Sequence, residues 1–483
     1  MFPSTDPIVS SILCNYLRST ESCPYYKNLI EKLDNWENLL TITEEICPYY
    51  LSRFTIEKYD LIATPYFYIF GPFAFDILFR YLLVEPFKII LVVDEAHNLP
   101  DFIFETNFTC LHIDSLNRIL NQLSEYCPDL SSPISTWLKS LILSINTQDR
   151  LCLLSSLMEI ERMMRIAFLR LSGNLKRKSL ILEILDFLSQ LSNITRAYPR
   201  VEKDLILRSS TGKVFSVPVR VSPFFLRIFS SFHSVILLSA TFSPYFLYQR
   251  LLGLHKIDKP VSRISIKSFF HNVRLKTFFI TGVSTAFKYR SRTLFEKISQ
   301  SLIAIFKKFC KRGILVFCPS RDIERIIFDL ISIHLRDNVK RERQIVGLLS
   351  TGISKQFINN VKPLILATIG GPFSEGVDFP FLDCVCIVGI PFPPPSLKEH
   401  FRQNLLLNEL QLSKRKTRYL GYVIPTINKS IHAIGRLTRP PNTSVNVFLI
   451  DQRYLRREYL KILPYWLTKD RRVLHINDLL KMV

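Results

Sequence analysis

The chain has 483 residues, enough for two or three domains that each bury a hydrophobic core. Lysine and arginine together number 63 against 41 aspartate and glutamate residues, which gives a formal net charge of +22. So large a basic excess favours a nucleic-acid partner and is more than general solubility requires.

The sequence predicts neither a membrane-spanning nor a secreted protein. Hydrophobic residues make up 48% of the chain, but charged side chains interrupt its most apolar region, Leu61 to Val93, before the roughly 18 residues that spanning needs. Residues 1–6 have no basic stretch ahead of an apolar one, as a secretory signal would. We therefore expect an intracellular protein, nuclear in a eukaryote or cytoplasmic in a prokaryote, whose 10 cysteines are thiols or metal ligands.

Three cysteines precede the first predicted strand. Cys14, Cys23 and Cys47 are widely and unevenly spaced, and Cys47 begins the sequence Cys-Pro-Tyr-Tyr. An iron–sulfur cluster takes four thiolates, so three cysteines can form part of such a site. Their spacing alone does not distinguish cluster ligands from ordinary buried cysteines.

A buried parallel strand is predicted where the apolar run 91–93 ends in Asp94, Glu95, Ala96 and His97. Strands of an α/β sheet deliver such residues to the carboxyl edge of the sheet, where nucleotides bind. One carboxylate can hold the water shell of Mg²⁺ while its neighbour orients the water that attacks a phosphate. Taken alone, the tetrapeptide would fit equally well a strand end whose carboxylates begin the next helix.

Residues 105–204 change to a helical pattern. Apolar residues recur every three or four positions from residue 153 to residue 171, which predicts a helix. A second helix is predicted from Ile113, with Asp114 or Ser115 as its N-cap. These apolar stripes are the core of a helical insertion and carry no chemistry.

The rest of the chain alternates predicted strands with helical patterns, which is typical of parallel sheets with right-handed crossovers. Strands are expected at 235–238, 276–280, 314–317, 364–367, 385–388 and 445–450. The first of them runs into Ser239 and Thr241, and the strand at 364–367 leads into a glycine-containing loop with Gly376 and Asp378.

Two arginines follow Gly435 near the end of the chain. Arg436 and Arg439 are three positions apart, so on a helix they would share a face and could reach one phosphate. A surface helix whose arginines pair with carboxylates is the simpler alternative.

With these motifs in this order, the chain resembles the XPD-like iron–sulfur DNA helicases of superfamily 2, which are DEAH-type, over nearly its whole length. The most specific stretches are 281–285, 373–379 and 388–395. The resemblance implies an α/β fold of two RecA-like motor domains with parallel sheets, the first incomplete, together with an iron–sulfur region and a helical arch insertion. It divides the chain into a partial first motor domain with the iron–sulfur region and DEAH box (1–104), the arch-like insertion (105–204), the return to the first motor domain (205–248) and the second motor domain (249–483).

The resemblance also implies roles for individual residues. Asp94 would position Mg²⁺, Glu95 would activate water, and Arg436 and Arg439 would stabilise the charge that develops on ATP. The residues expected to contact the nucleotide or couple it to DNA are His97, Ser239, Thr241, Gly376, Asp378, His432 and Gly435. His432 stands where the family usually has glutamine and so departs from the pattern. Cys14, Cys23 and Cys47 would bind a 4Fe-4S cluster whose fourth cysteine is not in this chain.

The implied function is that of an ATP-dependent DNA helicase of the DNA-repair type that moves 5′-to-3′ on single-stranded DNA. No Gly-x-x-x-x-Gly-Lys-Ser/Thr sequence is present, although that P-loop normally holds the β- and γ-phosphates. We therefore expect the chain as given to be inactive, as a truncated or split form of a longer enzyme. The alternatives are an ATPase-inactive DNA-binding platform, an enzyme completed by a partner protein that carries the P-loop, and a DinG-like helicase of the same iron–sulfur group.

Overall fold

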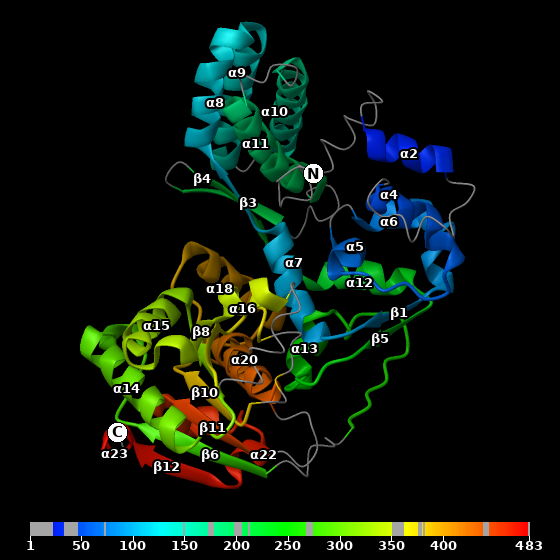
Figure 1. The fold of residues 1–483 in the computed structure, drawn as a ribbon. Helices are drawn as coiled ribbons and strands as arrows, with labels where there is room; N and C mark the ends of the chain where they lie inside the picture. Colours follow the sequence, from blue (N-terminus) through cyan, green and yellow to red (C-terminus); the bar gives the residue numbers. More distant parts are fainter. Residues whose placement is uncertain are drawn as a thin grey trace. The chain divides into compact units, whose positions relative to one another are not determined.

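The computed structural model describes residues 23–32, 47–71, 74–147, 150–171, 178–197, 205–210, 213–266, 274–349, 362–374, 379, 382–437 and 444–481. The chain divides into two compact units, which Figure 1 shows coloured along the sequence. Unit 1 contains Met1–Val261 and Asn404–Gln411, and unit 2 contains Ser262–Gln403 and Leu412–Val483. Each unit is described by itself below.

Unit 1 contains a short parallel sheet formed by two of the predicted strands. β1 (Ile90–Val93) pairs with β5 (Ser234–Leu237), and Val92 lies opposite Ile236. Leu91 and Val93 are buried, whereas Ile90, Val92, Ile236 and Leu238 are between 46% and 58% exposed. One face of this sheet therefore packs on the core, and the other presents aliphatic side chains to solvent. The helices near these strands in sequence are α2 (Pro24–Lys32), α4 (Pro48–Thr55), α5 (Tyr66–Phe70), α6 (Ala74–Leu82), α7 (Leu99–Asn107), α12 (Ser222–Ser231) and α13 (Tyr245–Leu251).

The middle of the unit 1 sequence forms a helical bundle. Its helices are α8 (Ile113–Tyr126), α9 (Pro128–Thr147), α10 (Arg150–Leu171) and α11 (Lys178–Ala197), which lie side by side around one apolar core (Figure 1). The helix predicted at 153–171 is confirmed as α10. None of the helices in the described ranges is both long enough and apolar enough to cross a membrane.

The bundle is accompanied by a three-stranded antiparallel sheet. β4 (Lys213–Pro218) lies between β2 (Thr109–His112) and β3 (Leu205–Ser210). Residues 205–218, for which the sequence predicted a return to the first motor domain, thus contain two paired strands, and the second of them, β4, pairs with the strand that directly precedes the helices. The predicted N-cap of α8 is wrong: His112 occupies that position, and Asp114 lies inside the first turn.

Unit 2 is built on a parallel sheet of seven strands. Their order is β12-β6-β11-β10-β7-β9-β8, and each pairing is parallel. The five strands predicted in this unit are confirmed as β6 (Arg274–Thr281), β7 (Ile314–Cys318), β9 (Leu364–Thr368), β10 (Cys384–Val388) and β11 (Ser444–Ile450). The two edge strands, β8 (Val339–Arg341) and β12 (Arg471–His475), were not predicted. Both are rich in basic residues, so neither gives an apolar run.

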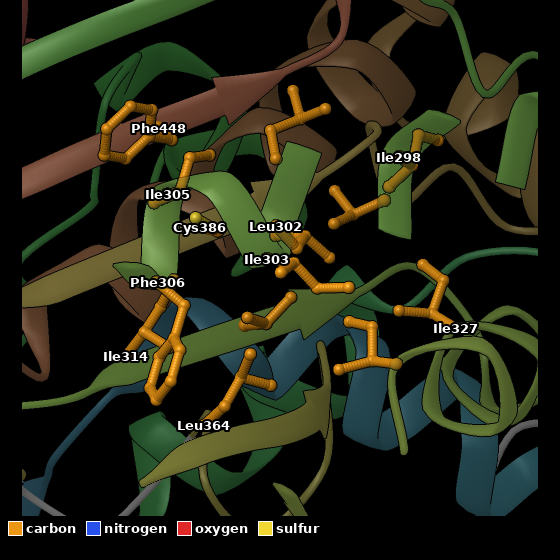
Figure 2. Packing of buried hydrophobic residues seen from close by; sticks show 14 of the residues in the cluster. Ile298, Leu302, Ile303, Ile305, Phe306, Ile314, Ile327, Leu364, Cys386 and Phe448 are labelled. Atoms are coloured by element: carbon orange, nitrogen blue, oxygen red, sulfur yellow. The ribbon is translucent and has the colours of Figure 1, made fainter. Parts of the chain in front are cut away.

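Helices cover both faces of the seven-stranded sheet. One core contains side chains of α14 (Arg292–Lys308), α15 (Arg321–Leu335) and α23 (Ile476–Leu480). Figure 2 shows part of it, with Leu302 and Phe306 of α14 packed together with Ile314, Leu364 and Cys386 of three strands. The opposite core contains side chains of α16 (Glu342–Leu349), α20 (Ile424–Gly435), α21 (Arg457–Leu460) and α22 (Tyr465–Thr468). β7 and β10 are buried along their whole length. Polar side chains can therefore become accessible only beyond the ends of these strands, at the edges of the sheet.

Candidate nucleotide site and nucleic-acid groove

Asp94 and Glu95 form a tight turn directly after β1. The exposed carboxylate of Asp94 accepts a hydrogen bond from the Glu95 backbone N–H through Oδ1, at 2.9 Å. The Tyr66 hydroxyl of α5 donates to the Asp94 carbonyl oxygen, which holds the turn from the other side. Glu95 has φ +47° and ψ +38°, a left-handed conformation that few residues other than glycine and asparagine adopt.

Two segments far apart in sequence meet at this turn. The N–H of Ala96 donates to the carbonyl of Leu238, at 2.9 Å, so the chain after β1 is joined to the chain after β5. His97 Nδ1 lies 2.9 Å from Ser239 Oγ and 3.3 Å from Glu95 Oε2. Ser239 Oγ in turn accepts the N–H of Thr241, at 3.0 Å. Five predicted site residues, Asp94, Glu95, His97, Ser239 and Thr241, are therefore brought together.

The chemistry of this arrangement suits a hydrated magnesium ion and a water to be activated. Asp94 offers an exposed carboxylate at the carboxyl end of a parallel strand, where Mg²⁺ can keep its water shell. Among the described residues, no three histidine, cysteine, aspartate or glutamate side chains are grouped to hold a metal ion directly. In nucleotide sites Mg²⁺ usually keeps several waters and binds through one or two carboxylates and the phosphates of the substrate.

Two of the three predicted cluster cysteines lie near each other in the described part of the chain. Cys23 precedes α2 and Cys47 precedes α4, and the Cys47 N–H donates to the carbonyl of Tyr25, at 3.1 Å. Both are free thiols of intermediate exposure, which suits thiolate ligands. Cys14 lies outside the described residues.

A repeated sequence could have strengthened the prediction for these cysteines. Cys23 and Cys47 each begin a Cys-Pro-Tyr-Tyr sequence, and in each case the helix starts at the proline. Proline is favoured in the first turn of a helix, so this repeat places both thiols at helix N-termini. Their surroundings are aromatic, with Tyr26 packed edge-on against Tyr50 and the Arg53 guanidinium above the Tyr50 ring.

The predicted site residues of unit 2 lie around the end of α20. His432 and Gly435 belong to the last turns of this helix, and the space beside the Gly435 Cα is open. Arg436, which follows, is only 8% exposed, and its Nε donates to the carbonyl of Ser374, at 3.1 Å. Its guanidinium thus contacts the loop after β9, and its predicted contact with ATP stays a prediction.

Three predicted residues of unit 2 cannot be placed. Gly376, Asp378 and Arg439 lie outside the described residues. The residues on either side of the loop are buried, and the rings of Phe373 and Phe379 pack edge to face with centroids 5.0 Å apart.

A large basic groove crosses one side of unit 2. It has a volume of about 2360 Å³ and is lined by nine basic residues against two acidic ones, Asp322 and Glu458. The basic residues are Arg290, Lys414, Arg415, Lys416, Arg418, Arg453, Arg456, Arg457 and Lys461. The positive charge of the sequence is thus concentrated where a polyanion could lie.

Aromatic side chains alternate with these charges. Phe392 and Tyr422 stack at 5.1 Å with their rings 17° apart, and Phe287 is 82% exposed at the groove. Alternating cations and aromatic faces is the pattern of proteins that bind single-stranded nucleic acids, whose bases stack on the rings.

The residues that support this groove were not predicted from the sequence. Asp451, after β11, accepts the N–H and hydroxyl of Thr285 through Oδ2 and also pairs with Arg453, at 2.7 Å. Arg453 also donates to the Thr285 hydroxyl, at 3.1 Å. The signal available in the sequence was a buried strand that ends at residue 450 and is followed directly by Asp451.

Two domain families match the sequence. DEAD_2 matches residues 7–116, and the helicase C-terminal domain family Helicase_C_2 matches residues 303–470. The first match contains the Asp94 turn, and the second contains the loop after β9 and α20.

Relatives with both parts are DNA helicases by name. The ATP-dependent DNA helicase XPD of Sulfolobus acidocaldarius is 23% identical over 86% of this chain, and the match spans 73% of that protein. The ATP-dependent DNA helicase CHL1 of Candida glabrata is 20% identical over 93% of this chain, which spans only 63% of CHL1.

Solved structures support the same fold. The "XPD_Helicase" structure is 20% identical and has a TM-score of 0.57, with 93% of this chain and 78% of that chain covered. The S. tokodaii Xpd4 structure has a TM-score of 0.57 at 19% identity, with 87% and 84% covered. With its RecA-like α/β architecture, the chain belongs to the XPD-like family of superfamily 2 helicases.

Proposed function

We propose that this chain is the motor of an ATP-dependent DNA helicase that moves along single-stranded DNA, in the 5′-to-3′ direction that its family resemblance implies. The observation that carries the proposal is the meeting of Asp94, Glu95 and His97 with Ser239 at the carboxyl ends of β1 and β5. Relatives of this chain are named as ATP-dependent DNA helicases.

In this proposal the two carboxylates have separate tasks. Asp94 holds waters of a magnesium ion, which when bound would neutralise charge on the ATP phosphates. Glu95 orients the attacking water and accepts its proton, and His97, 3.3 Å from Glu95 Oε2, keeps that carboxylate in position. Ser239, in contact with the same imidazole, links the site to the segment after β5.

The basic groove of unit 2 is the proposed path of the DNA strand. Its exposed basic residues would contact phosphates, and Phe287, which is 82% exposed, would stack on bases. This combination favours a single strand over a duplex, because the bases of a duplex are already stacked on each other.

We infer further that another polypeptide segment must supply the phosphate-binding loop, within the same chain or on a partner protein. The sequence contains no Gly-x-x-x-x-Gly-Lys-Ser/Thr, so Asp94 and Glu95 have no phosphate cradle opposite them. The exposed apolar face of the β1–β5 sheet supports this inference. Both faces of a parallel sheet are normally covered by helices, and two strands alone are marginally stable.

The test joins or co-expresses the chain with the P-loop segment of a relative such as the Sulfolobus XPD. We expect the completed protein to hydrolyse ATP in a DNA-stimulated manner. We expect Glu95→Gln to abolish turnover while nucleotide binding remains, because only the proton acceptor is lost.

The sheet face is tested separately. Val92→Thr should weaken association with a separately supplied P-loop segment. Threonine has nearly the same shape as valine, but it places a hydroxyl group on the apolar surface. Ile264→Thr, at a residue that is 86% exposed elsewhere in the chain, is the matched control.

If the completed protein binds single-stranded DNA but never hydrolyses ATP, the chain is an ATPase-inactive DNA-binding platform and the helicase proposal is wrong.

A further inference from the structure

The loop after β9 has every backbone donor satisfied. From Thr368 to Ser374 each residue except Pro372 has an N–H, and each N–H has a partner. Ile369 donates to the Cys318 carbonyl, Gly370 to Ser374 Oγ, Gly371 to the Thr368 carbonyl and Ser374 to the Gly371 carbonyl. The remaining two, Thr368 and Phe373, donate to one carboxylate. The pairing matters most at the buried end of the loop, Phe373 and Ser374, because unpaired buried N–H groups are destabilising.

That carboxylate belongs to Glu342, which is only 6% exposed. Oε2 accepts from Thr368 at 3.3 Å and Oε1 accepts from Phe373 at 2.5 Å, so the two oxygens hold the two ends of the turn. Glu342 is the first residue of α16 and directly follows β8, which pairs with β9 in parallel. The edge strand thus places its carboxylate beside the end of the neighbouring strand.

Gly371 permits this close approach. A Cβ at residue 371 would lie 2.6 Å from Glu342 Oε2 and 2.9 Å from Oε1, closer than van der Waals contact allows. The glycine is therefore needed for the space that the carboxylate occupies.

The same loop is held from its other side by Arg436. Its Nε donates to the Ser374 carbonyl, and the Arg436 carbonyl accepts the N–H of Phe379 on the far side of the loop. The outer side of the turn remains open, because nothing lies within 4 Å of the Cβ position of Gly370. Gly370 and Gly371 line a cavity of about 430 Å³ together with Arg321 and Arg343.

We propose that Glu342 is a positioning residue that holds this loop in the arrangement that binds DNA. Through the contact of Ser374 with Arg436, it also positions the end of α20. The proposal rests on the proposed function and on the family resemblance, which implies that the loop after β9 and the end of α20 contact nucleotide and DNA. Glu342 itself contacts only the loop among these elements, and it acts through the two N–H groups that it accepts.

The experiment compares Glu342→Gln with Glu324→Gln in the full chain. Glutamine at 342 has one oxygen for two N–H donors, and its amide group would face the second donor. Glu324 lines the same cavity and is buried, but it pairs with Arg341 at 2.5 Å and not with the loop. Amide hydrogen exchange measures the loop, and fluorescence anisotropy measures affinity for a single-stranded oligonucleotide.

We expect Glu342→Gln to speed exchange at residues 368–374 by roughly ten- to a hundredfold, as loss of a buried acceptor would. It should also weaken DNA binding about tenfold. Glu324→Gln keeps an oxygen that can accept from Arg341, so it should change both quantities less than Glu342→Gln does. Faster exchange with unchanged DNA affinity would show that Glu342 only stabilises the loop, and equal exchange in both variants would remove the proposed contact altogether.

A second pair of variants covers the case in which Glu342→Gln does not fold. Gly371→Ala should displace the carboxylate and open the loop, but it should add little in a Glu342→Ala background, because the colliding group is gone. Additive effects would overturn the proposal. If the unaltered chain binds no single-stranded DNA, the proposed function fails, while the exchange measurements still test the contact.

Discussion

A single buried carboxylate connects distant parts of unit 1. Glu409, near the end of α18 (Leu397–Leu410), accepts the N–H groups of Val221 and Ser222 through Oε1, at 2.6 and 2.7 Å. Its Oε2 accepts the Ser222 hydroxyl, at 2.9 Å. The residue thereby caps the N-terminus of α12. Burial raises the pKa of Glu409, and the three hydrogen bonds lower it only in part.

This raised pKa gives a stability effect that depends on pH. Because the folded-state pKa lies above the unfolded value, the stabilising contribution is present at low pH and is lost as pH rises through the folded pKa. Glu409→Gln keeps both acceptor bonds on its amide oxygen and can donate to Ser222 Oγ, but it has no charge to bury. At pH 8 we expect the free energy of unfolding of Glu409→Gln to exceed that of the unaltered chain. The difference should be about 1.4 kcal/mol for each unit by which burial raises the pKa of Glu409.

The measurement is urea denaturation at several pH values from 5 to 8, followed by a signal from unit 1. The difference between the two proteins should shrink toward pH 5. Glu409→Ala is the control and should be destabilised by about 1–3 kcal/mol throughout, since two N–H groups lose their acceptor. A constant difference between the glutamine variant and the unaltered chain would contradict the ionisation argument.

At the scale of residues, the sequence predicted contacts best where a motif ends a strand. Asp94 and Glu95 were predicted from the end of a strand, and the family resemblance added His97 and Ser239. The structure brings the four residues together. Glu342 was missed because it follows a strand of only three residues, so its partners depend on pairing that no local pattern shows. The cap of α8 was mispredicted because β2 ends directly before the helix.

At the scale of elements, the helices that follow Cys23 and Cys47 form the proposed cluster region. Both cysteines lie at helix N-termini and are of intermediate exposure. Cys310, Cys318, Cys384 and Cys386, in contrast, are buried in the core of unit 2, and burial contributes to a raised pKa for each thiol. These four thiols are therefore poor metal ligands.

An iron measurement tests the cluster proposal. When the chain is completed with the upstream segment of a relative, we expect anaerobic preparations to contain iron and sulfide and to absorb visible light. Cys47→Ser should lower the iron content several-fold, because one of four thiolates is lost. Cys110→Ser, at a partly exposed cysteine of β2, should leave it unchanged. If Cys47→Ser retains full iron, Cys14, Cys23 and Cys47 are structural thiols.

At the scale of the whole molecule, the net charge of +22 predicts salt-dependent DNA binding. Each phosphate contact on a single strand contributes about −0.7 to the log–log slope of affinity against salt. Replacing Lys414, Arg415 and Lys416 of the groove together by glutamine should therefore reduce the slope by about 2. The measurement is a titration with labelled oligonucleotide at several salt concentrations.

Three other basic residues provide the control for this charge change. Lys307, Lys308 and Lys311 are exposed in unit 2 and do not line the groove. Their replacement by glutamine changes the net charge equally, and we expect it to leave the slope nearly unchanged. Equal effects of the two triple variants would mean that binding follows net charge and that the groove is not the DNA path.

The overall architecture was predictable because both the sheet and the helices have strong periodic signals. Long apolar strands such as β7 and β10 are visible as buried runs, and the α10 stripe is visible as a helical period. The edge strand β12 was not visible, since Arg471 and Arg472 are exposed and only pairing with β6 makes the segment a strand. The pairing of β4 with β2 was equally unpredictable, because it joins segments about a hundred residues apart.

The left-handed backbone of Glu95 implies a conflict between stability and activity. For a residue other than glycine or asparagine this conformation costs about 1–2 kcal/mol, so the glutamate lowers the stability of the fold. Glu95→Asn should raise the melting temperature of unit 1 in calorimetry and abolish hydrolysis in the completed enzyme. Asp94→Asn, which removes a neighbouring charge without relieving the backbone, should abolish hydrolysis without that gain. If unit 1 were optimised for stability alone, Glu95 would therefore be among the first residues to be replaced.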